Sequence, residues 1–197
     1  MRSFNKDRIP KPRVTLPELS KGPLDVEIGC GVGLHPVNYC LKNPKRTLVA
    51  IDRSEMRMHK MLDRIKEQGG VPNLIPIREN AVWFVTHEIQ SSSVENYFFL
   101  YPNPYPKKKQ ANKRWYQMPF MSHVIETLKK KGHIHLATNM RYYAEEAEDF
   151  FVNVWKMKLI KKEKYSSLEE IPFSPRTHFE KKYLERGETC WYLMFQK

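Results

Sequence analysis

The sequence predicts a doubly wound α/β fold, in which helices cover both faces of one mostly parallel, seven-stranded sheet. Short apolar runs with strand character alternate with segments whose apolar residues recur at helical spacing. The chain has 197 residues, which suits one domain with a full-sized core. Neither an internal repeat nor a second domain boundary is visible in the sequence.

The predicted elements follow one another in a regular order. We expect strands at 24–28, 47–51, 74–78, 94–100, 132–138, 155–165 and 189–195, and helices at 35–41, 55–68, 119–130 and 142–154. Pro76 predicts that the third strand lies at a sheet edge, because proline cannot donate to a strand ladder. No long helix is expected between the last two strands, which predicts a C-terminal antiparallel hairpin.

The N-terminal segment differs from the rest of the chain in composition. Residues 1–23 are expected to form a basic, flexible arm ahead of a domain that spans 24–197. Its cations outnumber its acids, and three prolines oppose regular structure: the cations are Arg2, Lys6, Arg8, Lys11 and Arg13. The whole chain carries a net charge of +12, which favours a polyanionic partner such as nucleic acid.

The composition also indicates a compartment. There is no apolar run of about 18 residues, which is the length that a membrane-spanning helix needs. The N-terminus lacks the apolar stretch of a secretory signal. The three cysteines form no CxxC pair, and the seven histidines form no ligand cluster, so no metal site is expected. These observations predict a cytoplasmic protein, a monomer or a homodimer, with no membrane partner.

A glycine loop follows the first predicted strand. It does not fit the dinucleotide pattern G-x-G-x-x-G, because Leu34 stands where the last glycine is required, and Glu27 would repel a pyrophosphate. S-adenosylmethionine (SAM) carries an ammonium and a sulfonium, so a nearby carboxylate favours it. A second acid at the end of the next strand can hold both ribose hydroxyls. The sequence therefore predicts a SAM site at Glu27, Gly29, Gly31, Gly33 and Asp52; the alternative is a set of turn glycines with solvated acids.

A proline-rich segment follows the fourth predicted strand. It begins at Tyr101 and reads YPNPYPKKK, so its three prolines predict a stiff loop beside the cofactor crevice. Tyr101 and Tyr105 are suited to stacking on a base. The cations that follow suit phosphate groups; they are Lys107, Lys108, Lys109, Lys113 and Arg114. The alternative is a surface loop with a solvated run of charge.

Together these motifs resemble those of the bacterial tRNA (guanine-N7)-methyltransferases. The segment YPNPYPKKKQANKR is similar to the family's FPDPWPKK-type motif, Thr177-His178-Phe179-Glu180 to its T-x-F-E element, and Thr138-Asn139 to its T-D element. The resemblance runs from about Asp25 to the C-terminus. It implies a class I, Rossmann-like methyltransferase that uses SAM and methylates N7 of a guanine in tRNA.

The resemblance also implies roles for individual residues. It assigns cofactor binding to Glu27, Asp52 and the pair Asn80-Ala81, which matches the family's D-A pair. The same resemblance assigns substrate binding to Asn139, Thr177 and Glu180, and the positive charges of Lys107 and Arg114 predict that these two bind phosphates of the substrate. Asn103 takes the position of the family's proposed catalytic aspartate.

Asparagine replaces the family's aspartate at three positions: Asn80, Asn103 and Asn139. Asparagine keeps the shape and hydrogen bonds of aspartate but lacks its negative charge. At Asn103 this predicts slow chemistry, a different target or no reaction. Two alternatives therefore stay open: a catalytically impaired RNA-binding relative or partner subunit, and a methyltransferase that acts on another nucleobase or on a small molecule.

Overall fold

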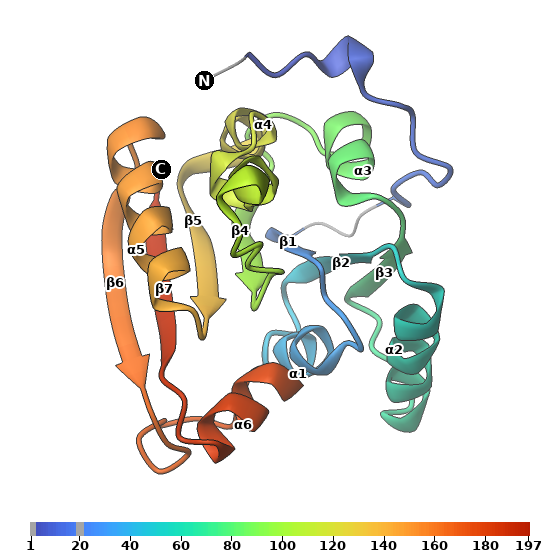
Figure 1. Ribbon diagram of the computed structural model, residues 1–197. Coiled ribbons are helices and arrows are strands. Elements are labelled where there is room, and N and C mark those ends of the chain that lie inside the picture. Colours follow the sequence, from blue (N-terminus) through green and yellow to red (C-terminus); the bar gives the residue numbers. More distant parts are fainter. Residues whose placement is uncertain (1–2, 19–21) are drawn as a thin grey trace.

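Seven strands form one sheet in the computed structural model, which describes residues 3–18 and 22–197 (Figure 1). The strand order is β3-β2-β1-β4-β5-β7-β6. Strands β1 to β5 are parallel, and β7 runs antiparallel to both β5 and β6. Their bounds are β1 Leu24–Ile28, β2 Thr47–Asp52, β3 Leu74–Arg78, β4 Val94–Leu100, β5 Leu128–Thr138, β6 Lys158–Tyr165 and β7 Cys190–Gln196. The predicted fold class, including the antiparallel C-terminal strands, is confirmed.

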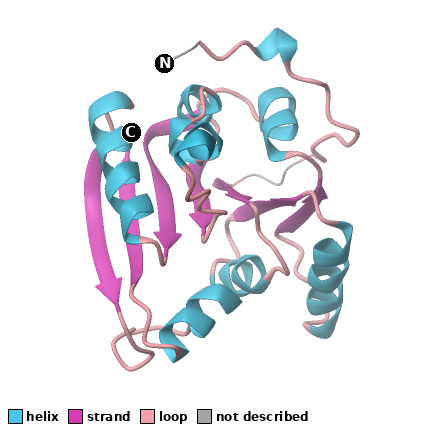
Figure 2. Cartoon of the chain, viewed as in Figure 1, coloured by secondary structure: helices cyan, strands magenta, loops and turns pink. Residues whose placement is uncertain are grey.

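Helices flank the sheet on both sides (Figure 2). Their bounds are α1 Leu34–Lys42, α2 Glu55–Glu67, α3 Ala81–Glu88, α4 Phe120–Thr127, α5 Arg141–Asp149 and α6 His178–Glu185. Side chains of α1 and α2 pack on one face of the sheet, and side chains of α3, α4 and α5 pack on the other. Within the described residues, no helix is long and apolar enough to span a membrane.

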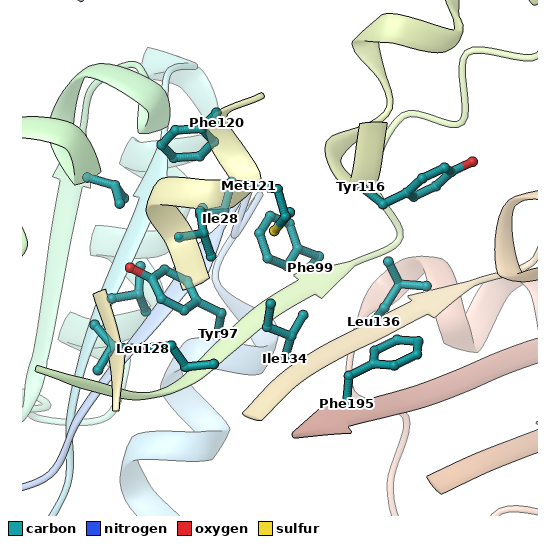
Figure 3. Packing of buried hydrophobic residues seen from close by; sticks show 14 of the residues in the cluster. Ile28, Tyr97, Phe99, Tyr116, Phe120, Met121, Leu128, Ile134, Leu136 and Phe195 are labelled. Atoms are coloured by element: carbon teal, nitrogen blue, oxygen red, sulfur yellow. The ribbon is translucent and has the colours of Figure 1, made fainter. Parts of the chain in front are cut away.

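The two faces of the sheet bury two separate apolar cores. On the larger one, Tyr97 and Phe99 of β4 and Ile134 of β5 lie on the side of the sheet that carries Met121 of α4 (Figure 3). All of them are at most 1% exposed. Because each such side chain contributes roughly 1.5–3 kcal/mol when it is fully buried, these strands form a rigid base for the loops at their carboxyl ends.

Several element boundaries differ from the predictions. Helix α3 was missed because its sequence, AVWFVTHE, is apolar on most sides and shows no helical stripe. Helix α6 was also missed. It lies between the last two strands, which are therefore joined through a helix rather than a simple turn. The predicted helix at 119–130 ends at Thr127, because β5 begins four residues earlier than expected, at Leu128. Pro76 does lie in an edge strand, as predicted.

Residues 3–18 run beside α3 and α4 (Figure 1). The Phe4 ring stacks on His123 with their centroids 5.8 Å apart. The backbone N–H of Arg13 donates to Glu79 at 2.8 Å. Arg2 of the predicted basic arm, with Met1 and residues 19–21, lies outside the described residues. The flexibility of the arm and its boundary at residue 23 stay predictions.

Candidate functional site

The glycine loop connects β1 to α1 at the carboxyl edge of the sheet. Gly31 and Gly33 have φ of 59° and 79°, a region that side chains with a Cβ rarely adopt. A Cβ at Gly33 would also lie only 2.3 Å from Cγ of Met61 on α2. The backbone therefore approaches α2 too closely for any other residue, and the N-terminus of α1 opens toward the edge of the sheet.

Asp52 ends β2 and faces this loop. Its Oδ2 accepts from the Gly31 N–H at 3.0 Å, and its Oδ1 accepts from the Ser54 N–H at 2.8 Å. Nη1 of Arg57 is 3.6 Å from Oδ2. A carboxylate can accept about four hydrogen bonds, so it keeps acceptor capacity for a ligand beside these two bonds. The two backbone N–H groups fix the orientation of the carboxylate before any ligand binds.

Glu27 lies in β1 and is 2% exposed. Its Oε2 is 2.6 Å from Nδ1 of His35 in α1, so the imidazole donates from Nδ1 to the carboxylate. Burial raises the pKa of the Cys30 thiol well above its usual value, and the carboxylates of Glu27 and Asp52 raise it further. Both acids therefore lie close to the glycine loop, as the sequence predicts.

Asn80 is the N-cap residue of α3, just after β3, and Ala81 is the first residue of that helix. The Asn80 Oδ1 accepts from the Val82 N–H at 2.9 Å and caps the helix. Asparagine and aspartate cap helices about equally well, so the neutral residue does not weaken this corner. The structure thus brings the pair to the same edge of the sheet as Glu27, the glycine loop and Asp52.

The proline-rich loop leaves β4 in a constrained conformation. Tyr101 and Tyr105 have φ of 52° and 45°, which is costly for residues with a Cβ. Between them, the exposed Asn103 accepts at Oδ1 from the Tyr105 N–H at 3.3 Å. Lys107 is also exposed. The loop therefore presents Asn103 to solvent on a strained backbone that its surroundings must hold in place.

Arg114 holds one end of this loop. Its Nε and Nη2 donate to the Tyr105 carbonyl at 3.2 and 3.0 Å, and its Nη1 pairs with Glu146. The guanidinium also lies 5.1 Å from the Tyr142 ring centroid, and the residue is 4% exposed. Phosphate binding by Arg114 stays a prediction, but in this structure the side chain is engaged inside the protein.

Glu180 holds the other end of the loop. It is fully buried, and its Oε1 accepts from the Tyr101 hydroxyl at 3.0 Å and from Nη2 of Arg176 at 2.6 Å. Burial raises the pKa of Tyr101, and the Glu180 carboxylate raises it further, so the tyrosine stays a donor. Thr177 caps α6 by accepting from the Glu180 N–H at 3.0 Å.

The remaining predicted substrate residue, Asn139, follows β5. Its Nδ2 donates to Glu188 at 2.9 Å, which connects the end of β5 to the segment before β7. The assignments of Asn139, Thr177 and Glu180 to the substrate stay predictions. Sequence reasoning missed His35 and Arg176. For Arg176 a signal was available, because it directly precedes Thr177 in the T-x-F-E element.

A glycine loop flanked by two strand-end acids, on a sheet of this order, defines the class I methyltransferase fold. Residues 21–193 match the family model Methyltransf_4, whose description reads "Putative methyltransferase", and the chain belongs to this methyltransferase family. It is 28% identical over 178 residues to a tRNA (guanine-N(7)-)-methyltransferase of Neisseria meningitidis serogroup C (strain 053442), covering 90% of this chain and 73% of that one.

A second relative has the same name, and solved structures share the fold. The tRNA (guanine-N(7)-)-methyltransferase of Nitrosomonas eutropha is 29% identical, with 89% of this chain and 76% of that one covered. An antibiotic-related methyltransferase superimposes with a TM-score of 0.66 at 14% identity, covering 89% and 87%. A 16S rRNA (adenine(1408)-N(1))-methyltransferase from Catenulisporales acidiphilia gives 0.62 at 15%, covering 88% and 85%.

Proposed function

We propose that this chain is a SAM-dependent methyltransferase that modifies N7 of a guanine in tRNA. The proposal rests on one observation: two sets of functional groups lie at the same edge of the sheet. One set is the glycine loop with Glu27 and Asp52, and the other is the strained loop that presents Asn103. The relatives that match most of the chain are named for this reaction. A tRNA partner and a cytoplasmic location are parts of the same proposal.

The residues of the glycine-loop region fit SAM. Glu27 is a buried carboxylate for the ammonium, and Asp52 keeps acceptor capacity for the ribose hydroxyls. Asn80 caps α3 with Oδ1, which leaves its Nδ2 amide to donate to the adenine beside Ala81. Gly29, Gly31 and Gly33 allow the close backbone approach. When bound, SAM supplies a methyl group on a positively charged sulfur.

The second set of groups positions the base. Guanine N7 has a free lone pair, so no base needs to remove a proton, and the protein acts chiefly by alignment. Asn103 orients the guanine by hydrogen bonds, and Tyr101 and Tyr105 offer rings for stacking. Lys107 pairs with phosphate on the exposed side of the loop. Asn139, Thr177 and Glu180 hold the nucleoside, and Arg114 keeps Tyr105 in place.

Nucleoside mass spectrometry tests the proposal directly. Purified protein is incubated with unmodified tRNA and isotope-labelled SAM, and the tRNA is digested. We expect labelled 7-methylguanosine from the parent protein, from the Asn103→Asp variant, or from both. The Glu27→Gln variant is the matched control and should give none. Absence of the product from both proteins, combined with no SAM binding by calorimetry, rejects the proposal.

One observation favours a second candidate. Asn103 is neutral where a carboxylate would stabilise the positive charge that develops on the methylated purine. A non-catalytic RNA-binding relative would bind tRNA with the usual salt dependence and yield no labelled nucleoside, even as Asn103→Asp. The same experiment therefore separates the two functions.

A further inference from the structure

A cavity of about 260 Å³ opens on the face of the sheet that α1 covers. It lies under α1 and extends over β4, β5 and β7. Its lining combines aromatic rings with polar groups: His35, Tyr39, Asn96, Phe98, Leu100, His135, Arg176 and Tyr192. The proposed function assigns no group of the cofactor or the substrate to it.

The cavity adjoins Glu27. In the strand register Glu27 is opposite Phe98, and Phe98 is opposite His135, so these three side chains lie in one row on one face. The His35 ring completes the connection, because it donates from Nδ1 to Glu27 and also lines the cavity. A ligand group held by Glu27 therefore lies beside this cavity.

Arg176 is the one residue of this lining that carries a permanent positive charge. Its Nε and Nη2 donate to Glu180, and its guanidinium lies 4.2 Å from the Tyr192 ring centroid. Burial disfavours the charge, but the Glu180 carboxylate outweighs it and raises the pKa of Arg176. Among the described residues no hydrogen-bond partner is assigned to Nη1, so one donor of a fixed cation is available to the cavity.

The strand order matches the order of groups along the cofactor. Asn80 follows β3, Asp52 ends β2 and Glu27 lies in β1, and the proposed function assigns these residues to adenine, ribose and ammonium. The next strand in the sheet is β4, which forms the wall of the cavity. The one group of the cofactor still without a partner is the carboxylate on the same carbon as the ammonium. Burying it unpaired would be costly.

We propose that Arg176 binds the carboxylate of the cofactor's methionine end through Nη1, from within this cavity, while His35 positions Glu27 for the ammonium. The proposal rests on the proposed function, because it needs SAM in the glycine-loop site. It makes Arg176 a bridge: one side of the guanidinium holds the cofactor, and the other holds Glu180 and, through it, Tyr101 of the substrate loop. Cofactor binding and loop position are then coupled through one side chain.

A pair of ligands that differ only in the carboxylate tests this contact. S-adenosylhomocysteine and its decarboxylated form, S-adenosyl-3-thiopropylamine, are titrated into the whole protein by calorimetry. We expect the parent to bind the first 10- to 100-fold more tightly, which is the range for hydrogen bonds to charged groups. In Arg176→Gln that ratio should fall to about threefold or less, with the affinity for the decarboxylated ligand nearly unchanged.

Arg186→Gln is the matched control and should keep the full ratio. Arg186 follows α6 as Arg176 precedes it, and its side chain is 57% exposed. If Arg176→Gln fails to fold, Arg176→Lys preserves the charge beside Glu180 and removes Nη1, and it should also lose the ratio. A ratio that survives in both variants overturns the inference, and so does an equal loss for both ligands, which would mean a purely structural arginine. If the parent binds neither ligand, the proposed function fails as well.

Discussion

The two halves of the carboxyl edge are held in opposite ways. In the cofactor half, around β1, β2 and β3, backbone N–H groups hold short side chains, as Gly31 and Ser54 do for Asp52. In the substrate half, around β4 and α6, long side chains hold the backbone and one another, as Arg114 does for the Tyr105 carbonyl. The cofactor half is thus held by backbone hydrogen bonds. The substrate half is held by side chains, whose partners Glu146 and Glu180 lie 32 and 79 residues from Arg114 and Tyr101.

This difference has a functional meaning. A site held by backbone groups keeps its shape whether or not a ligand is present, which favours a small ligand of constant shape. A loop held by Glu180 at Tyr101 and by Arg114 at Tyr105 stores strain and shifts when either side chain moves. The comparison predicts that substitutions in the first half change cofactor affinity alone, and that those in the second half change stability or turnover.

The largest effect is expected from Asp52→Ala. The variant loses the ribose contacts and the acceptor that orients Gly31, so affinity for S-adenosylhomocysteine should fall several hundredfold, as for two charge-assisted hydrogen bonds of about 1.5–3 kcal/mol each. Calorimetry measures it. Glu55→Ala, an exposed acid at the start of α2, is the control and should leave affinity unchanged. If tRNA affinity fell equally, the separation of the two halves would be wrong.

The second effect concerns turnover. Asn103→Asp keeps the hydrogen bond from the Tyr105 N–H and adds a negative charge beside the proposed guanine site. Because a well-placed charge changes rates on the order of 10²-fold, methylation of tRNA should rise by about that factor with cofactor affinity unchanged. Single-turnover kinetics with labelled SAM gives the rate. A rate that stays the same or falls would mean that Asn103 does not face the reacting base.

The fold and the cofactor half could be predicted from sequence because their determinants are local. Alternating apolar segments define the sheet, Pro76 marks its edge, and the glycine loop lies within seven residues of Glu27. The substrate half could not be predicted in the same way. Arg114 ends a run of exposed lysines and looks like one of them, but its partner Glu146 is 32 residues further along the chain. Only the tertiary structure distinguishes a buried arginine from a solvated one.

The third prediction separates Arg114 from those lysines. Arg114→Met removes both donors to the Tyr105 carbonyl and the charged partner of Glu146, which keeps its hydrogen bonds from Tyr116 and Gln117. The free energy of unfolding should therefore fall by about 2.5 kcal/mol. Denaturant titration measures it. Arg141→Met is the control, because that exposed arginine forms its ion pair with the exposed Glu145, and it should change stability by less than about 0.5 kcal/mol. If the Arg114→Met protein were as stable as the parent but bound tRNA more weakly, Arg114 would instead be a phosphate-binding residue.

The fourth prediction concerns the boundary between the halves, where His135 lines the cavity. Its Nε2 donates to Oδ1 of Asn96, and in the neutral ring its Nδ1 accepts from the Tyr192 hydroxyl. Burial and, to a lesser extent, nearby positive groups such as His133 together lower its pKa to about 3. In the unfolded chain His135 takes up a proton near pH 6.5, and in the folded protein it does not. The contribution of His135 to the free energy of unfolding is therefore complete above pH 6.5 and is lost as the pH falls toward 3.

Between pH 7 and pH 5 this amounts to about 2 kcal/mol, because each pH unit below 6.5 costs about 1.4 kcal/mol. His135→Gln preserves a donor for Asn96 and an acceptor for Tyr192 but does not titrate. Denaturant titrations at the two pH values should show a smaller acid loss in the variant, by about that amount. An identical loss in both proteins would mean that His135 is protonated in the folded state.

The smallest effect is expected from the exposed lysines of the substrate half. Replacing Lys107, Lys108 and Lys109 with glutamine should weaken tRNA binding by about tenfold at moderate salt, with no change in stability. The slope of log affinity against log salt concentration should fall by the amount that corresponds to the loss of about two to three phosphate contacts. The chain offers a charge-matched control at the opposite end of the sheet, where Lys129–Lys131 lie near the start of β5. Both triple variants lose the same net charge. If RNA lies across the carboxyl edge, only the first loses salt dependence, whereas equal losses would mean that overall charge, rather than this loop, attracts the RNA.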